Sequence, residues 1–109
     1  MTIAKEEIFG PVMSVFKYKT IDEAIVRANA SVYGLAAGVM TSNIETAIKV
    51  TNALQAGSAF VNCYEVGDVN APFGGFKDSG FGKDLGYEGL KGYLETKTVI
   101  MKRPDDSLP

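Results

Sequence analysis

Two amphipathic stretches with a helical period constrain the fold of this chain more than any other feature. The first opens with Thr20 and Glu23, a capping box whose hydroxyl and carboxylate can satisfy free N–H groups of a first helical turn. The apolar residues that follow share one helical face: Ile21, Ala24, Ile25 and Ala28. The pattern predicts a helix that ends near Ala30.

The second stretch opens with a similar box, Ser42-Asn43-Ile44-Glu45. Its predicted buried stripe follows at the same spacing: Ile44, Ala47, Ile48, Thr51 and Leu54. Gly57 is placed to end this helix in a left-handed conformation.

Short apolar runs alternate with these helices and predict strands at Val12–Tyr18, Leu35–Thr41 and Ser58–Asn62. Strands joined through helices of this length need right-handed crossovers, which build a parallel sheet. A last helix near Gly86–Glu95 and a β-branched terminal strand at Thr96–Lys102 complete the order. The predicted fold class is therefore α/β.

The stretch between the third strand and the last helix has no period. Eight of the 12 glycines lie between Gly67 and Gly92, so we expect a long loop whose backbone comes close to something. Neither phosphate-binding motif fits this loop. A dinucleotide fingerprint would need glycine in place of Leu85, and a P-loop would need glycine in place of Lys77.

Composition excludes several classes of function. Hydrophobic residues make up 46% and charged residues 22%, which predicts a globular chain, and a net charge of -2 offers nothing to nucleic acid. Histidine is absent, which removes the commonest general base and metal ligand. Cys63, the single cysteine, has no histidine to activate it and is expected to be a small buried residue. No apolar run approaches the roughly 20 residues of a membrane helix, so we expect a soluble protein without a membrane partner.

Three strings identify a family. They are Met1-Thr2-Ile3-Ala4-Lys5-Glu6-Glu7-Ile8-Phe9-Gly10-Pro11-Val12, then Leu54-Gln55-Ala56-Gly57 with Phe60-Val61-Asn62-Cys63-Tyr64, and last Pro72-Phe73-Gly74-Gly75-Phe76-Lys77-Asp78-Ser79-Gly80-Phe81-Gly82-Lys83-Asp84-Leu85-Gly86. In order and spacing the chain resembles the C-terminal segment of the NAD(P)-dependent aldehyde dehydrogenase superfamily from Met1 to about Lys102. The 1/2-type and formyltetrahydrofolate-dehydrogenase branches look nearest.

The resemblance implies oxidation of aldehydes to carboxylic acids with NAD or NADP. In that family a cysteine thiolate attacks the carbonyl, hydride passes to the nicotinamide, and a glutamate-activated water hydrolyses the thioester. The family's nucleophile, base and cofactor fold all precede the motif at Met1–Val12, and Cys63 does not match the nucleophile. We therefore expect no catalytic residue in this chain, and no turnover by the chain alone.

Some functional positions carry over through the resemblance. Glu7 matches the glutamate that accepts hydrogen bonds from the nicotinamide ribose, and Phe9 matches the aromatic beside the nicotinamide. Phe73 matches an aromatic of the substrate tunnel, whose apolar wall excludes water. A further stretch shapes the same tunnel: Glu65, Val66 and Gly67. Gly67 stands where relatives place a bulky aromatic, which would widen the tunnel.

Other positions match the proton path and the subunit boundary. Asp84 matches a glutamate that supports proton movement near the base, and the alternative role is an aspartate at the last helix's N-terminus. Glu95 matches a boundary glutamate that pairs with basic residues, with Lys83 as its local candidate. Thr98 and Ile100 lie in the strand through which the family forms dimers and tetramers, so we expect a homo-oligomer.

The resemblance divides the chain into residues 1–95 of the catalytic domain, 96–103 as oligomerisation strand, and 104–109 as tail. Met1 matches an interior methionine, so we expect a longer chain, cytoplasmic or alternatively mitochondrial. One alternative is a stand-alone, non-catalytic module that associates with full-length subunits. Another is an unrelated small α/β binding domain.

Overall fold

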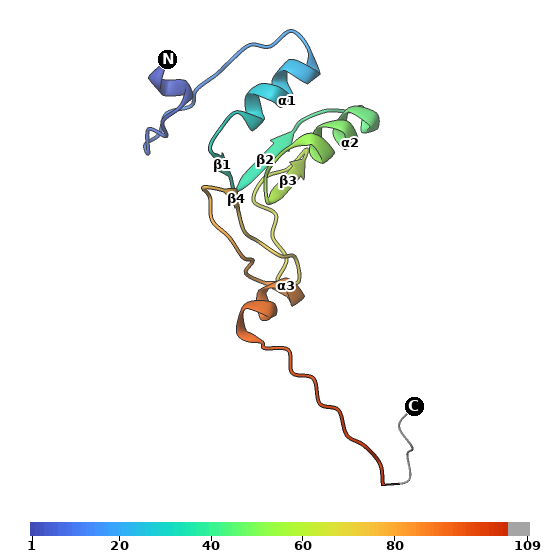
Figure 1. Ribbon diagram of the computed structural model, residues 1–109. Helices are drawn as coiled ribbons and strands as arrows, with labels where there is room; N and C mark the ends of the chain where they lie inside the picture. The colour runs from blue at the N-terminus through green and yellow to red at the C-terminus, as the bar shows by residue number, and fades with distance from the viewer. Residues whose placement is uncertain (105–109) are drawn as a thin grey trace.

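The computed structural model describes residues 1–104, and Figure 1 shows an elongated chain with a small α/β unit near one end. The α-helices are α1 (Ile21–Asn29), α2 (Ile44–Ala53) and α3 (Gly86–Leu90); the strands are β1 (Tyr33–Gly34), β2 (Ala36–Val39), β3 (Ser58–Val61) and β4 (Phe76–Lys77); the 3-10 turns are η1 (Thr2–Ala4) and η2 (Lys91–Tyr93).

A parallel β2–α2–β3 crossover forms the centre of the fold and confirms the predicted α/β class. Ala36 pairs with Ser58 and Val39 with Val61, and α2 lies against both strands (Figure 1). Ala47 and Val50 of α2 are the buried hydrophobic residues of the described part of the chain.

The predicted apolar stripe of α2 is only partly right. Ala47 is buried, but Ile44 and Ile48 are 69% and 54% exposed, while Val50 is turned inward. A helix buries only the arc that a neighbouring element covers, and here β2 and β3 cover the arc with Ala47 and Val50. Ile44 and Ile48 therefore lie outside the contact between α2 and the strands.

Side-chain caps begin both long helices. The Thr20 hydroxyl accepts from the Glu23 N–H (3.2 Å), as predicted, while the Glu23 carboxylate accepts from the Lys19 N–H (2.8 Å). That backbone hydrogen bond from Lys19 lowers the pKa of Glu23, and Arg27 adds to the effect. At α2 the cap is Asn43, whose Oδ1 accepts from Thr46 N–H (2.8 Å), one residue later than the predicted Ser42.

Gly57 does not end α2, contrary to the sequence prediction. The helix ends at Ala53, and Leu54 follows in an extended conformation. Gly57 instead allows a close backbone approach, because a Cβ there would overlap the Gly74 carbonyl oxygen. Its N–H donates to the Gly34 carbonyl (3.0 Å), so three chain segments meet at this glycine.

The short antiparallel pair β1–β4 was not predicted. Tyr33 lies opposite Lys77, and the Lys77 ammonium donates to the carbonyls of Asn29 (3.0 Å) and Ser31 (2.8 Å) just after α1. A cation at free helix carbonyls is stabilising, so Lys77 ties the glycine-rich loop to α1. The Asn29 side chain links α1 to the end of α2, since it donates to Ala53 O (2.7 Å) and accepts from Gln55 N–H (2.8 Å).

Other predicted elements differ in the structure. Within residues 1–104 neither Val12–Tyr18 nor Thr96–Lys102 pairs as a strand, because no neighbour supplies backbone partners. The helix predicted over Gly86–Glu95 divides into α3 and η2. The tail predicted at 104–109 lies, apart from Pro104, outside the described residues.

The chain is far more open than its mass predicts. A compact protein of this size exposes about 5,900 Å² and has a radius of gyration near ~13 Å. This chain exposes 9526 Å² and has a radius of gyration of 21.0 Å. Much of it therefore borders space that other protein would fill. No helix of the described residues is long and apolar enough to cross a bilayer.

Candidate functional site

The N-terminal segment brings together the two residues expected to contact cofactor. Glu7 and Phe9 both line a concavity of about 300 Å³. Phe9 is 90% exposed, and its φ of 56° lies in the left-handed region, which an aromatic residue adopts only when something holds it there. The backbone thus presents the ring outward beside the carboxylate.

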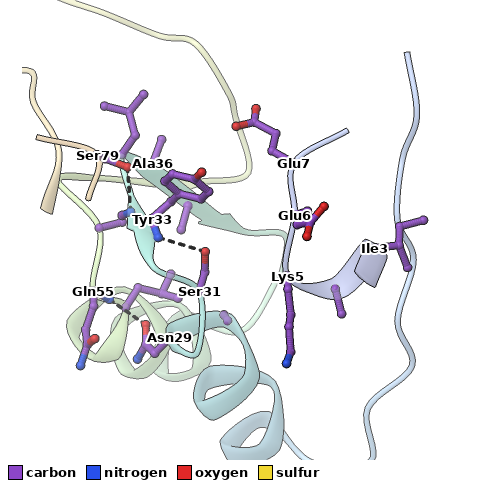
Figure 2. Close-up of a pocket in the computed structure, with 17 residues that line it drawn as sticks. Ile3, Lys5, Glu6, Glu7, Asn29, Ser31, Tyr33, Ala36, Gln55 and Ser79 are labelled. Atoms are coloured by element: carbon purple, nitrogen blue, oxygen red, sulfur yellow. Dashed lines mark hydrogen bonds between the residues drawn. The ribbon is translucent and has the colours of Figure 1, made fainter. Parts of the chain in front are cut away.

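Glu7 also borders a larger cavity of about 470 Å³, which the N-terminal segment shares with β1, β2 and the residues after α2. Figure 2 shows Lys5, Glu6 and Glu7 on one side of it and Tyr33 and Gln55 on the other. The Glu7 side chain points along the segment away from Lys5, so these two opposite charges do not pair.

The Glu7 carboxylate is available to a ligand. The ion pairs of residues 1–104 join Arg27 to Glu23, Lys49 to Asp22 and Lys91 to Glu88, and none involves Glu7. A carboxylate with two free oxygens can accept two hydrogen bonds from vicinal hydroxyls, and such charge-assisted bonds are strong. The acceptor oxygens of Glu7 therefore fit a ribose diol.

The backbones of Phe73 and Asp84 pair directly. Phe73 N–H donates to Asp84 O (2.8 Å) and Asp84 N–H donates to Phe73 O (2.7 Å), an antiparallel bridge that closes the glycine-rich loop. Asp84 directly precedes Leu85, the N-cap residue of α3, where no side chain makes a capping hydrogen bond. The bridge fixes the tunnel candidate and the proton-path candidate relative to each other.

The remaining tunnel candidates lie in the exposed loop after β3. Glu65 has a φ of 55°, Val66 is 68% exposed, and a Cβ built on Gly67 would meet nothing within 4 Å. The two cavities described above include none of these residues. The structure thus forms two separate clusters and does not join the cofactor candidates to the tunnel candidates.

Lys83 does not pair with Glu95, contrary to the prediction. Its ammonium donates to the Gly74 carbonyl (2.7 Å) and lies 4.9 Å from the centre of the Phe76 ring. Lys83 therefore stabilises the fold of the glycine-rich loop.

The boundary candidates lie on an extended arm that leaves η2 and runs away from the rest of the molecule (Figure 1). Glu95 and Thr98 are exposed, and Ile100 is 93% exposed. An apolar side chain in this state is typical of a surface that another element covers.

Sequence reasoning missed the role of Asn62, which directly follows β3. Asn62 has a φ of 54°, and its side-chain amide pairs with the backbone of Thr41. An asparagine directly after a strand was the available signal, since asparagine adopts the left-handed region more readily than most residues.

Comparison with known proteins identifies the family. The aldehyde dehydrogenase family model matches residues 1–99. Aldehyde dehydrogenase 1 of Tanacetum cinerariifolium is 62% identical over 91% of this chain, and the human mitochondrial aldehyde dehydrogenase is 57% identical over 95% of it. Each match spans 20% of the relative's length.

Solved structures of aldehyde dehydrogenases also match this chain. An NAD+ complex of a Bacillus cereus aldehyde dehydrogenase superposes with a TM-score of 0.87 at 52% identity, covering 91% of this chain and 20% of that one. Apo betaine aldehyde dehydrogenase of Staphylococcus aureus gives 0.86 at 45% identity, covering 89% and 19%. The open shape of the chain thus matches about one fifth of each of these longer relatives, and the chain belongs to the aldehyde dehydrogenase family.

Proposed function

We propose that this chain is the C-terminal part of the catalytic domain of an NAD(P)-dependent aldehyde dehydrogenase, which oxidises aldehydes to carboxylic acids. The observation that carries the proposal is the match in fold and sequence to complete family enzymes, including NAD+ complexes. The exposed surface of 9526 Å² supports it, because the missing four fifths would cover that surface.

In the complete subunit, bound NAD or NADP would accept the hydride. The task of Glu7 is to hold the ribose through two hydrogen bonds, and the task of Phe9 is to confine the nicotinamide from one side. Their shared concavity supports these two roles. Neither residue forms or breaks a bond, so both act by orienting the reacting groups.

The tunnel candidates would guide the aldehyde. Phe73 would give an apolar wall that keeps water away, and Glu65, Val66 and Gly67 would shape the entrance. The absence of a side chain at Gly67 supports a wide tunnel there. Asp84, fixed to Phe73 by the backbone bridge, would support proton movement between the base and solvent.

The extended arm would join subunits. Residues 96–103 would add to the sheet of another subunit through backbone hydrogen bonds, with Thr98 and Ile100 at the contact and Glu95 paired with its basic residues. The arm's lack of a partner strand within residues 1–104 supports this homo-oligomer.

A hybrid subunit tests the proposal. Residues 1–104 of this chain replace the matching stretch of the human mitochondrial enzyme, and NADH formation is followed with acetaldehyde. We expect the hybrid to turn over and the isolated chain to show no turnover. A folded, tetrameric or dimeric hybrid without activity would contradict the proposed function.

The proposed ribose contact of Glu7 can be tested by substitution, with the neighbouring Glu6 as a matched control. Losing a charged acceptor weakens binding by about 1.5–3 kcal/mol, so Glu7→Gln in the hybrid should raise the KM for NAD at least about tenfold. Glu6 lines the same two cavities, and Glu6→Gln should leave that KM unchanged. Equal effects of the two substitutions would remove the ribose role.

The extended arm also favours a second candidate function, a stand-alone module that binds full-length subunits. Tagged 109-residue chain would then co-purify with a full-length family enzyme, and deletion of residues 96–103 would abolish the association. Retention of the shortened chain would remove this candidate.

A further inference from the structure

The chain turns sharply where it leaves β3. Asn62 still donates its N–H to the Val39 carbonyl (3.0 Å), but its φ of 54° bends the backbone out of the sheet. The Asn62 side chain then makes the hydrogen bonds that the backbone of the next strand residue would make: Oδ1 accepts from Thr41 N–H (2.8 Å) and Nδ2 donates to Thr41 O (2.9 Å). Two hydrogen bonds hold a conformation that is unfavourable for a side-chain-bearing residue.

Tyr64 folds back onto the sheet two residues later. A Cβ built on Gly38 of β2 would lie 3.0 Å from the Tyr64 hydroxyl oxygen, 3.1 Å from its Cε1 and 3.1 Å from the Phe60 carbonyl oxygen. The ring also lies 6.0 Å from Phe60, centre to centre, at an interplanar angle of 51°. The ring is thus seated on a position where β2 carries no side chain.

The next residue is again left-handed, with a φ of 55° at Glu65. Tyr64 therefore stands between two unfavourable backbone conformations, at Asn62 and Glu65. Such conformations persist only where the surroundings over-determine them, and this turn has two sets of contacts, the Asn62–Thr41 hydrogen bonds and the Tyr64 ring against Gly38.

We infer that Tyr64, seated on Gly38, is a positioning residue that sets the path of Glu65, Val66 and Gly67 and so selects between small and bulky aldehydes. The inference rests on the proposed function, in which these three residues shape the tunnel. Gly38 would then act on the aldehyde preference from within the sheet, through its contact with the Tyr64 ring.

A double-mutant cycle in the hybrid subunit tests this coupling. Tyr64→Ala should change the ratio of kcat/KM for benzaldehyde over acetaldehyde by roughly tenfold, because small displacements of guiding residues alter rates strongly. Gly38→Ala should shift the same ratio in the Tyr64 background and shift it less in the Tyr64→Ala background, where only the contact with the Phe60 carbonyl remains. The KM for NAD should stay constant throughout.

Tyr64→Phe keeps the ring and should preserve the ratio, which separates seating from any chemistry of the hydroxyl. Gly92→Ala is the matched glycine control, because a Cβ there would meet nothing within 4 Å. A constant aldehyde ratio in Tyr64→Ala would overturn the inference. So would an equal effect of Gly38→Ala in both backgrounds.

Hydrogen–deuterium exchange separates this inference from the proposed function. An unsubstituted hybrid without turnover would mean that the proposed function fails. Tyr64→Ala should still speed exchange at residues 65–67 and leave α2 unchanged. Unchanged exchange at residues 65–67 would overturn the positioning role, whatever the activity. If Tyr64→Ala fails to fold, Tyr64→Leu, which removes the ring but keeps an apolar side chain, takes its place in both measurements.

Discussion

Replacing Gly57 by alanine should be the most damaging single-methyl change in this segment. The added Cβ would overlap the carbonyl oxygen of Gly74 and lie 3.0 Å from the Lys83 ammonium nitrogen. The first of these contacts is to backbone, so no side-chain rotation relieves it. Two hydrogen bonds depend on the same approach, Gly57 N–H to Gly34 O (3.0 Å) and Lys83 Nζ to Gly74 O (2.7 Å).

The loss of folding free energy in Gly57→Ala can be worked out from these contacts. Overpacking in a rigid site costs about 1–3 kcal/mol, and each weakened hydrogen bond adds about 1 kcal/mol. A total of about 3–5 kcal/mol would lower the melting temperature by roughly 6–20 °C, at 2–4 °C per kcal/mol for a domain of 150–250 residues. Differential scanning fluorimetry of the hybrid subunit measures this shift.

Gly92→Ala is again the control. A Cβ at Gly92 meets nothing within 4 Å and its φ is not positive, so the change should be neutral or stabilise the fold by up to about 1 kcal/mol. Equal melting temperatures for the Gly57→Ala and Gly92→Ala hybrids would refute the close-approach reasoning.

Three further predictions concern the helix ends, each read from the hybrid's melting temperature. Asn29→Ala removes two hydrogen bonds to the end of α2 and should destabilise by about 1–3 kcal/mol, with Asn52→Ala, on the exposed side of α2, as a control that stays near the parent. Lys77→Met leaves the Asn29 and Ser31 carbonyls at the end of α1 without their cation and should also destabilise the hybrid, while Lys17→Met, at an exposed side chain without an ion pair in residues 1–104, should not. Because the pKa of Glu23 is lowered in the folded state, the stability that its carboxylate contributes is present above the usual value of 4.5 and is lost as pH falls through the folded value. The difference in melting temperature between the parent hybrid and Glu23→Gln should therefore vanish in acid. A constant difference from pH 7 to pH 3 would contradict this.

The sequence predicted the elements whose causes are local. The helices α1 and α2 follow from apolar period and from caps one turn away, and the parallel pairing of β2 with β3 follows from the crossover between them. The strands β1 and β4 have two residues each and meet across a long stretch of chain, so no local pattern marks them. Val12–Tyr18 and Thr96–Lys102 have strand-like sequences, but a strand also requires a neighbour.

The candidate site divides in the same way. The resemblance named Glu7 and Phe9, and the structure gives them a shared concavity. The resemblance could not reveal that Lys83 donates to the Gly74 carbonyl, because every residue has a backbone carbonyl and the residue type does not show which one accepts a hydrogen bond. The fold of a loop that is closed by backbone contacts depends on geometry that side-chain patterns do not encode.

The proposed subunit contact would make the order of the extended arm after η2 depend on protein concentration. The N–H and C=O groups of the arm have no strand partner within residues 1–104, and in that contact a second molecule would supply one. The population of the ordered arm should then rise with protein concentration, while the β2–α2–β3 unit stays independent of it. Dilution would separate the two: the arm would lose its order first, at the dissociation constant of the assembly.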